Sequence, residues 1–113
     1  MAGFGDQKIS NKKKTKLDRG KQVRGEALLM SAIRHHAQGD LINAENRYRE
    51  AIKIDYRHHS VFMNLGVICK NSGRIEEAIF LYKKGIKISP DGPDASINLA
   101  YSYQILGNFK DSV

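Results

Sequence analysis

Two pairs of adjacent histidines and a single cysteine are the residues of this chain whose types could bind a metal ion or act as a nucleophile. They are His35-His36, His58-His59 and Cys69. Adjacent side chains on a helix point about 100° apart, so neither pair presents two imidazoles on one face. No further cysteine or carboxylate completes a zinc site at a recognised spacing. The sequence therefore predicts no metal and no cofactor, and a buried, inert Cys69 thiol.

Phosphate-binding and hydrolytic motifs are also missing from the sequence. The segment from Gly20 to Gly25 has the spacing of a Walker loop, but Glu26 follows where a lysine is needed to reach the phosphates. No HExxH, EF-hand or GxSxG pattern occurs, and no motif places an acid beside a base. We therefore expect that this chain alone is not an enzyme.

Length and composition predict a single small domain. The chain has 113 residues, of which 41% are hydrophobic and 27% are charged, as in an ordinary globular protein. With one cysteine no internal disulfide can form, which excludes a disulfide-stapled secreted scaffold and favours the reducing cytoplasm. No apolar run approaches the ~20 residues of a membrane-spanning helix, and the N-terminus has no apolar signal-peptide core.

Most of the net charge of +7 lies at the N-terminus. Residues 1–24 contain eight basic and two acidic residues, whereas the rest of the chain is nearly neutral. This segment has few bulky apolar residues and cannot bury enough surface to offset its ordering entropy, so we expect a disordered basic tail over 1–24. The tail could contact nucleic acid or an anionic surface weakly, or serve only as a solvated leader. The lysines concerned are Lys12, Lys13, Lys14 and Lys16.

Three glycines recur with a period of 34 residues, namely Gly39, Gly73 and Gly107. Each lies between two segments of helical apolar spacing, which predicts a helix-turn-helix unit repeated along the chain. The predicted helices cover 25–38, 41–54, 59–71, 74–88, 93–106 and 108 to the end. Asp40 and Asn108 are expected to cap the helices after the first and third turns, a part that Arg74 cannot play.

These units resemble the tetratricopeptide repeat (TPR) family, whose unit is a helix-turn-helix of 34 residues. The second unit fits best, through Phe62, Leu65, Gly66, Gly73, Ala78, Tyr82 and Pro90. The resemblance implies an all-α fold in which the TPR helix-turn-helix repeats stack as a short right-handed α-solenoid. It divides the TPR domain, residues 25–113, into repeat 1 over 25–58, repeat 2 over 59–92 and a partial repeat 3 over 93–113.

The resemblance also implies a concave groove, lined by the first helix of each unit, that holds a peptide. The groove-facing residues that it implies are Leu29, Ile33, Met63, Asn64, Val67, Lys70, Ile97, Asn98 and Tyr101. The alternative is that some of the apolar ones pack between repeats. The carboxylate clamp of co-chaperone arrays is absent, because only Asn64 agrees with it. Asn64 and Asn98, one period apart, more weakly resemble the asparagine ladder of O-linked N-acetylglucosamine transferases, where amides hold an extended peptide.

We therefore expect a cytoplasmic scaffold that binds an extended peptide or protein segment in the concave groove. One alternative is an N-terminal, substrate-presenting fragment of a larger TPR-containing transferase of the glycosyltransferase type. Another is nucleic-acid or anionic-surface binding through the basic tail. The second helix of repeat 3 has little more than one turn, so the apolar groups of 97–106 lack a partner. That open face implies either a longer array or self-association.

Overall fold

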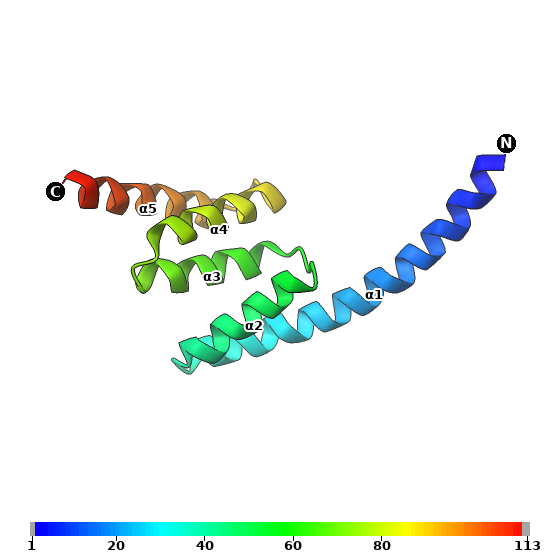
Figure 1. Cartoon of the computed structure of the whole chain (residues 1–113), viewed down its shortest axis with the longest axis horizontal. Coiled ribbons are helices and arrows are strands. Elements are labelled where there is room, and N and C mark those ends of the chain that lie inside the picture. The colour runs from blue at the N-terminus through cyan, green and yellow to red at the C-terminus, as the bar shows by residue number, and fades with distance from the viewer. Residues whose placement is uncertain (1, 112–113) are drawn as a thin grey trace.

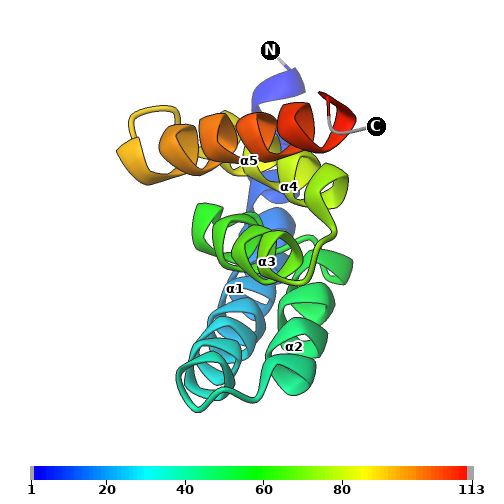
Figure 2. The ribbon, with the colours of Figure 1, turned by 90° about the vertical axis from the view of Figure 1, so that its left-hand side faces the viewer.

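The computed structural model describes the backbone of residues 2–111 and the side chains of 16–92 and 96–108. Residues 2–111 form five helices, α1 Ala2–Ala37, α2 Leu41–Lys53, α3 His59–Asn71, α4 Ile75–Ile88 and α5 Pro93–Asp111. α1 packs with α2 and α3 with α4 as helical hairpins, and α5 lies against α4 (Figure 1). Viewed from the end, the hairpins and α5 stack in chain order (Figure 2). The predicted all-α class and the stacked helix-turn-helix units are confirmed.

The core forms where a small residue of one helix receives an aromatic ring from the next. A Cβ atom at Gly66 would lie 2.5 Å from Cε1 of Tyr82, so only glycine lets the ring rest on the backbone of α3. Tyr48 stands one period before Tyr82, and both side chains are fully buried. The packing residues of the two hairpins thus form one continuous core. Its other large members are Leu29, Tyr56, Val61, Phe62, Leu65, Ile68, Cys69 and Leu81.

The first helix is longer than predicted. α1 begins at Ala2, whereas the sequence predicts a disordered tail up to residue 24 and a helix from residue 25. The N-terminal half of α1 projects away from the other helices (Figure 1), and Leu17 and Val23 are 74% and 70% exposed. Scarce apolar residues thus keep this segment from packing. They do not prevent a helix, since lysine, arginine, glutamine and leucine have high intrinsic helix propensity.

α1 contacts the rest of the molecule at Lys21 and Gly25. Gly25 is buried against the ring of Tyr56, in a space where a Cβ atom would overlap that ring. Lys21 forms an ion pair with Asp55, with 3.5 Å between Nζ and Oδ2. Tyr56 and Asp55 both belong to the connection between α2 and α3. This connection therefore packs against α1 at the point where its projecting segment begins.

Two of the three periodic glycines form turns. Gly39 and Gly73 have φ angles of 78° and 84°, a left-handed conformation that glycine adopts without strain. Gly107 instead lies inside α5, so the predicted sixth helix and the predicted cap at Asn108 are wrong. Glycine permits a left-handed turn but does not impose one. At the first two glycines the next helix packs back on the previous one, and within the described residues no helix does so after Gly107.

The two kinds of glycine should respond to alanine with opposite signs. Gly73→Ala places a Cβ atom in a left-handed turn and is expected to lower the free energy of unfolding by about 1–2 kcal/mol. Gly107→Ala lies within a helix and in open space, and is expected to raise it by about 0.5–1 kcal/mol. Urea unfolding measures both changes. Destabilisation by Gly107→Ala equal to that at Gly73 would mean that Gly107 is a turn after all.

Of the N-caps of α2, α3 and α4, those of α2 and α4 agree with the predictions from the sequence. Asp40 caps α2 as predicted, since its Oδ1 accepts a hydrogen bond from the backbone N–H of Asn43 at 3.3 Å. Arg74 makes no side-chain cap bond at α4, also as predicted. α3 is capped by His58, whose Nδ1 accepts from the backbone N–H of Ser60 at 3.2 Å. This role was not predicted, and it requires that Nδ1 carries no proton.

Candidate interaction surface

The predicted groove residues meet most closely where α3 faces α5. Lys70 Nζ donates a hydrogen bond to Oδ1 of Asn98 at 3.4 Å. The same ammonium group lies 5.5 Å from the centre of the Tyr101 ring, a cation–π geometry. One residue of α3 therefore joins two residues of α5 that lie one turn apart. We call the surface formed by Met63, Asn64, Val67, Lys70, Ile97, Asn98 and Tyr101 the α3–α5 face.

The α3–α5 face has an apolar, open side and a half-buried side. Ile97 and Tyr101 on α5 are 65% and 57% exposed. Met63, Asn64 and Val67 on α3 are half-buried, and Val67 packs against the core. A peptide lying on this face would therefore bury mainly side chains of α5.

The two residues predicted on α1 do not join this face. Leu29 is only 7% exposed and belongs to the core, so the prediction of a groove-facing Leu29 is wrong. The resemblance to the TPR family places Leu29 on the groove side, whereas its side chain packs into the hydrophobic core. Ile33, one turn further on, is 44% exposed on α1, whose packing partner is α2.

Each asparagine of the predicted ladder has a partner within the chain. Burial raises the pKa of Tyr48, and a hydrogen bond between its hydroxyl and the side chain of Asn64 acts in the opposite direction. Asn98 accepts from Lys70 as described. A carboxamide has one acceptor oxygen and two donor hydrogens, so both amides keep bonding capacity for a peptide backbone.

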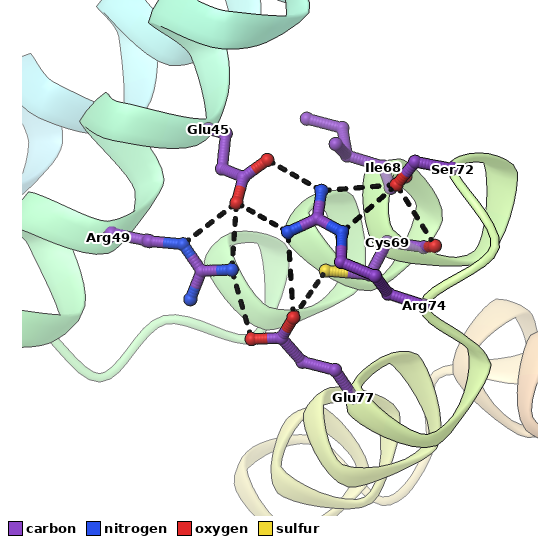
Figure 3. A network of polar contacts seen from close by, with 7 residues as sticks. All are labelled: Glu45, Arg49, Ile68, Cys69, Ser72, Arg74 and Glu77. Atoms are coloured by element: carbon purple, nitrogen blue, oxygen red, sulfur yellow. Dashed lines mark hydrogen bonds and ion pairs between the residues drawn. The ribbon is translucent and has the colours of Figure 1, made fainter.

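An ionic network between the two hairpins was not predicted from the sequence (Figure 3). The carboxylate of Glu45 on α2 accepts two hydrogen bonds from the guanidinium of Arg74, both at 2.7 Å. Arg49 Nη2 lies 2.8 Å from Glu45 Oε2 and 2.9 Å from Glu77 Oε2, so it bridges α2 and α4. Local spacing indicates only part of this network, since Glu45 and Arg49 have i,i+4 spacing and Arg74 and Glu77 have i,i+3 spacing. The contacts between the hairpins have no such signal.

The network changes the acid–base chemistry of the groups that it surrounds. Hydrogen bonds from Arg74, and from Arg49, lower the pKa of Glu45 from 4.5 to about 2. Cys69 lies beneath the network, with Sγ 3.5 Å from Oε1 of Glu77. Burial first, and then the charge of Glu77, raise the pKa of its thiol to about 11. The predicted burial of Cys69 is confirmed, and the inertness of its thiol stays a prediction.

The histidine pairs serve local structure. His35 Nδ1 lies 3.2 Å from Oδ2 of Asp40, beside the first turn. The rings of His58 and His59 stack, with 4.8 Å between their centres. Among the side chains that the structure describes, no three His, Cys, Asp or Glu residues are grouped so that they could hold a metal ion.

The structure describes the side chains of only some of the N-terminal lysines. Lys16 is exposed on α1, and the side chains of Lys12, Lys13 and Lys14 lie outside the described residues. Over the described part of the chain, no helix has the length and apolar character needed to cross a membrane.

A cavity of about 600 Å³ lies at the end of the stack, where α4 begins and α5 runs past it. Its apolar lining comes from Ile75 on α4 and from Ile105 and Leu106 on α5. This is the region where the sequence predicts an open repeat face. Self-association through it stays a prediction.

Comparison with known proteins supports the repeat assignment. Residues 66–107 match a family model described as TPR repeat. The chain is also similar to anaphase-promoting complex subunit 3 of Schizosaccharomyces pombe, with 21% identity over 87 residues. That alignment covers 77% of this chain but 13% of the yeast protein. TPR repeats generally mediate contacts between proteins.

Proposed function

We propose that this chain is a TPR-type protein–protein interaction module that binds an extended peptide or protein segment along the α3–α5 face. The observation that carries the proposal is the exposure of two large apolar side chains, Ile97 and Tyr101, beside the Asn98 amide that Lys70 contacts. Exposed apolar groups that gather on one face mark interaction sites. The match to TPR repeats supports the same class of function.

The chemistry of the face favours an extended backbone over a charged chain terminus. Asn64 and Asn98 can each donate to a carbonyl and accept from an N–H, which are the two groups that an extended peptide presents repeatedly. Lys70 is the only cation of the face, and it is already engaged by Asn98 and the ring of Tyr101. The apolar contacts would supply affinity, and the amides would fix register.

The proposal places this module in the cytoplasm, where a reduced cysteine is ordinary. In this role the chain carries no chemistry of its own, and it presents or assembles other proteins. The buried Cys69 and the locally bonded histidines agree with that role, because none of them offers a reactive group at the α3–α5 face.

The test is selection of short peptides from a random display library on the immobilised chain. Selected peptides are then titrated against the double variant Asn64→Ala/Asn98→Ala. Each lost amide contact is worth about 0.5–1.5 kcal/mol, so we expect affinity to fall roughly 5- to 100-fold if the two effects add.

The matched control is Leu41→Ser/Ile42→Ser, which changes two exposed apolar residues on α2. It should leave affinity within about twofold. Melting curves check that both variants fold. Failure to enrich any peptide, or equal affinity for wild type and the asparagine variant, would contradict the proposal.

A further inference from the structure

A second surface lies between the end of α2, the connection to α3 and the outer side of α4. It encloses a cavity of about 800 Å³. The buried rings of Tyr56 and Phe62 lie at its base, and Ile52, Phe80 and Ile88 add to its apolar lining. None of these residues belongs to the α3–α5 face, so the two surfaces are separate. We call this cavity and its rim the α2–α4 pocket.

The rim of the α2–α4 pocket is basic. Lys83, Lys84 and Lys87 line it from α4, and Arg57 lines it from the connection. Lys83 and Lys87 have i,i+4 spacing and Lys84 and Lys87 have i,i+3 spacing, so three ammonium groups share one side of the helix. All three lysines are exposed, and the ion pairs found among the described side chains include none of them. Their charge is therefore available to a ligand.

Aromatic rings hold two of these lysines in place. Lys84 Nζ lies 5.1 Å from the centre of the Phe80 ring, and Lys83 Nζ lies 5.5 Å from that of Tyr103 on α5. Cation–π contacts of this kind restrict long side chains without neutralising them. Phe80 is itself 59% exposed and lines the pocket, so an apolar surface lies directly beside a fixed positive charge.

Among the side chains that the structure describes, one acidic residue lines the α2–α4 pocket. Asp55 lies 3.2 Å from Nε of Arg57 and 3.5 Å from Nζ of Lys21. The guanidinium of Arg57 in particular lowers the pKa of Asp55, so its carboxylate stays charged and paired. The pocket therefore has a net positive rim around an apolar base.

We propose that the α2–α4 pocket binds an acidic peptide segment that inserts an apolar side chain between its carboxylates. The positive rim matches the carboxylates, and the apolar base matches the inserted side chain. A nucleic acid fits less well, because Lys84 already lies over the ring of Phe80, where a base would stack.

The experiment titrates the whole chain into a labelled short peptide of aspartate and glutamate with a central leucine–phenylalanine pair. Fluorescence anisotropy is read at low and at physiological salt. The variant Lys83→Gln/Lys84→Gln/Lys87→Gln removes the three rim charges of α4. Each exposed charge contributes roughly two- to fivefold, so we expect affinity to fall about 10- to 100-fold.

Two controls separate pocket recognition from general charge attraction. Lys16→Gln/Arg19→Gln/Arg24→Gln removes the same net charge from exposed positions of α1, and it should change affinity by less than about threefold. A peptide with alanines in place of the leucine–phenylalanine pair should bind wild type more weakly, because the apolar base then has no ligand.

Equal losses in the two charge variants would overturn the proposal, and so would equal binding of the alanine peptide. If a single-stranded oligonucleotide of matched charge binds more tightly than the peptide, the proposal is overturned and the ligand of the pocket is a nucleic acid. None of these outcomes bears on the α3–α5 face, since the substituted residues lie outside it.

Discussion

Tyr82→Ala is expected to lower the free energy of unfolding by about 3–5 kcal/mol, the range for removing a large aromatic side chain from a core. The Tyr82 ring is fully buried and rests on the backbone of α3 at Gly66. A small neighbour cannot move in to fill the space, because the cavity is bounded by helix backbone on that side.

The matched control for Tyr82→Ala is Tyr103→Ala, which removes an aromatic ring that is 45% exposed on α5. It should cost about 1 kcal/mol or less. Tyr82→Phe keeps the ring and should be close to wild type. Guanidinium unfolding curves give all three values, and a loss for Tyr82→Ala no larger than that for Tyr103→Ala would show that the hairpin core is packed differently.

The second large effect is a loss of stability in acid that depends on Glu45. Its pKa of about 2 in the folded protein lies below the ordinary 4.5 of the unfolded chain. The unfolded chain therefore binds a proton first as the pH falls, so the stabilisation present above pH 4.5 is lost progressively down to about pH 2. Each pKa unit corresponds to about 1.4 kcal/mol, which gives roughly 2 kcal/mol lost by pH 3.

Glu45→Gln isolates this effect, because it keeps the shape of the side chain and removes its titration. The variant should be less stable than wild type at neutral pH, since it leaves Arg74 without its carboxylate partner. Between pH 7 and pH 3 it should lose about 2 kcal/mol less than wild type does. Denaturant titrations at the two pH values measure the difference, and parallel losses in both proteins would show that the network does not hold the hairpins together.

The sequence predicts best what depends on local pattern and repetition. The turns at Gly39 and Gly73 follow from a glycine between two amphipathic segments, and the cap at Asp40 follows from a short carboxylate beside free amides. Gly66 and Tyr82 are both positions that fit the repeat, and the structure brings them into contact. Because each unit contacts its neighbours in the same way, three units in register are enough to predict the fold class.

The features that the sequence does not predict depend on contacts between units. Leu29 and Ile33 occupy neighbouring turns of α1 with similar side chains, yet one enters the core and the other stays exposed. Arg74 and Glu45 lie in different hairpins, so no local sequence spacing predicts their bidentate ion pair. The extended α1 is a different case, since helix propensity acts without any packing, whereas the prediction considered burial alone.

The most direct test of peptide binding on the α3–α5 face is a nitrogen–proton correlation spectrum of the whole, isotope-labelled chain, recorded as a library-selected peptide is added. The expected result is that the largest shift changes fall on the backbone amides of 63–70 and 97–101. The outer helices, α2 and α4, should change little. Shift changes concentrated on α2 or α4, with the amides of the α3–α5 face unmoved, would contradict the proposed function.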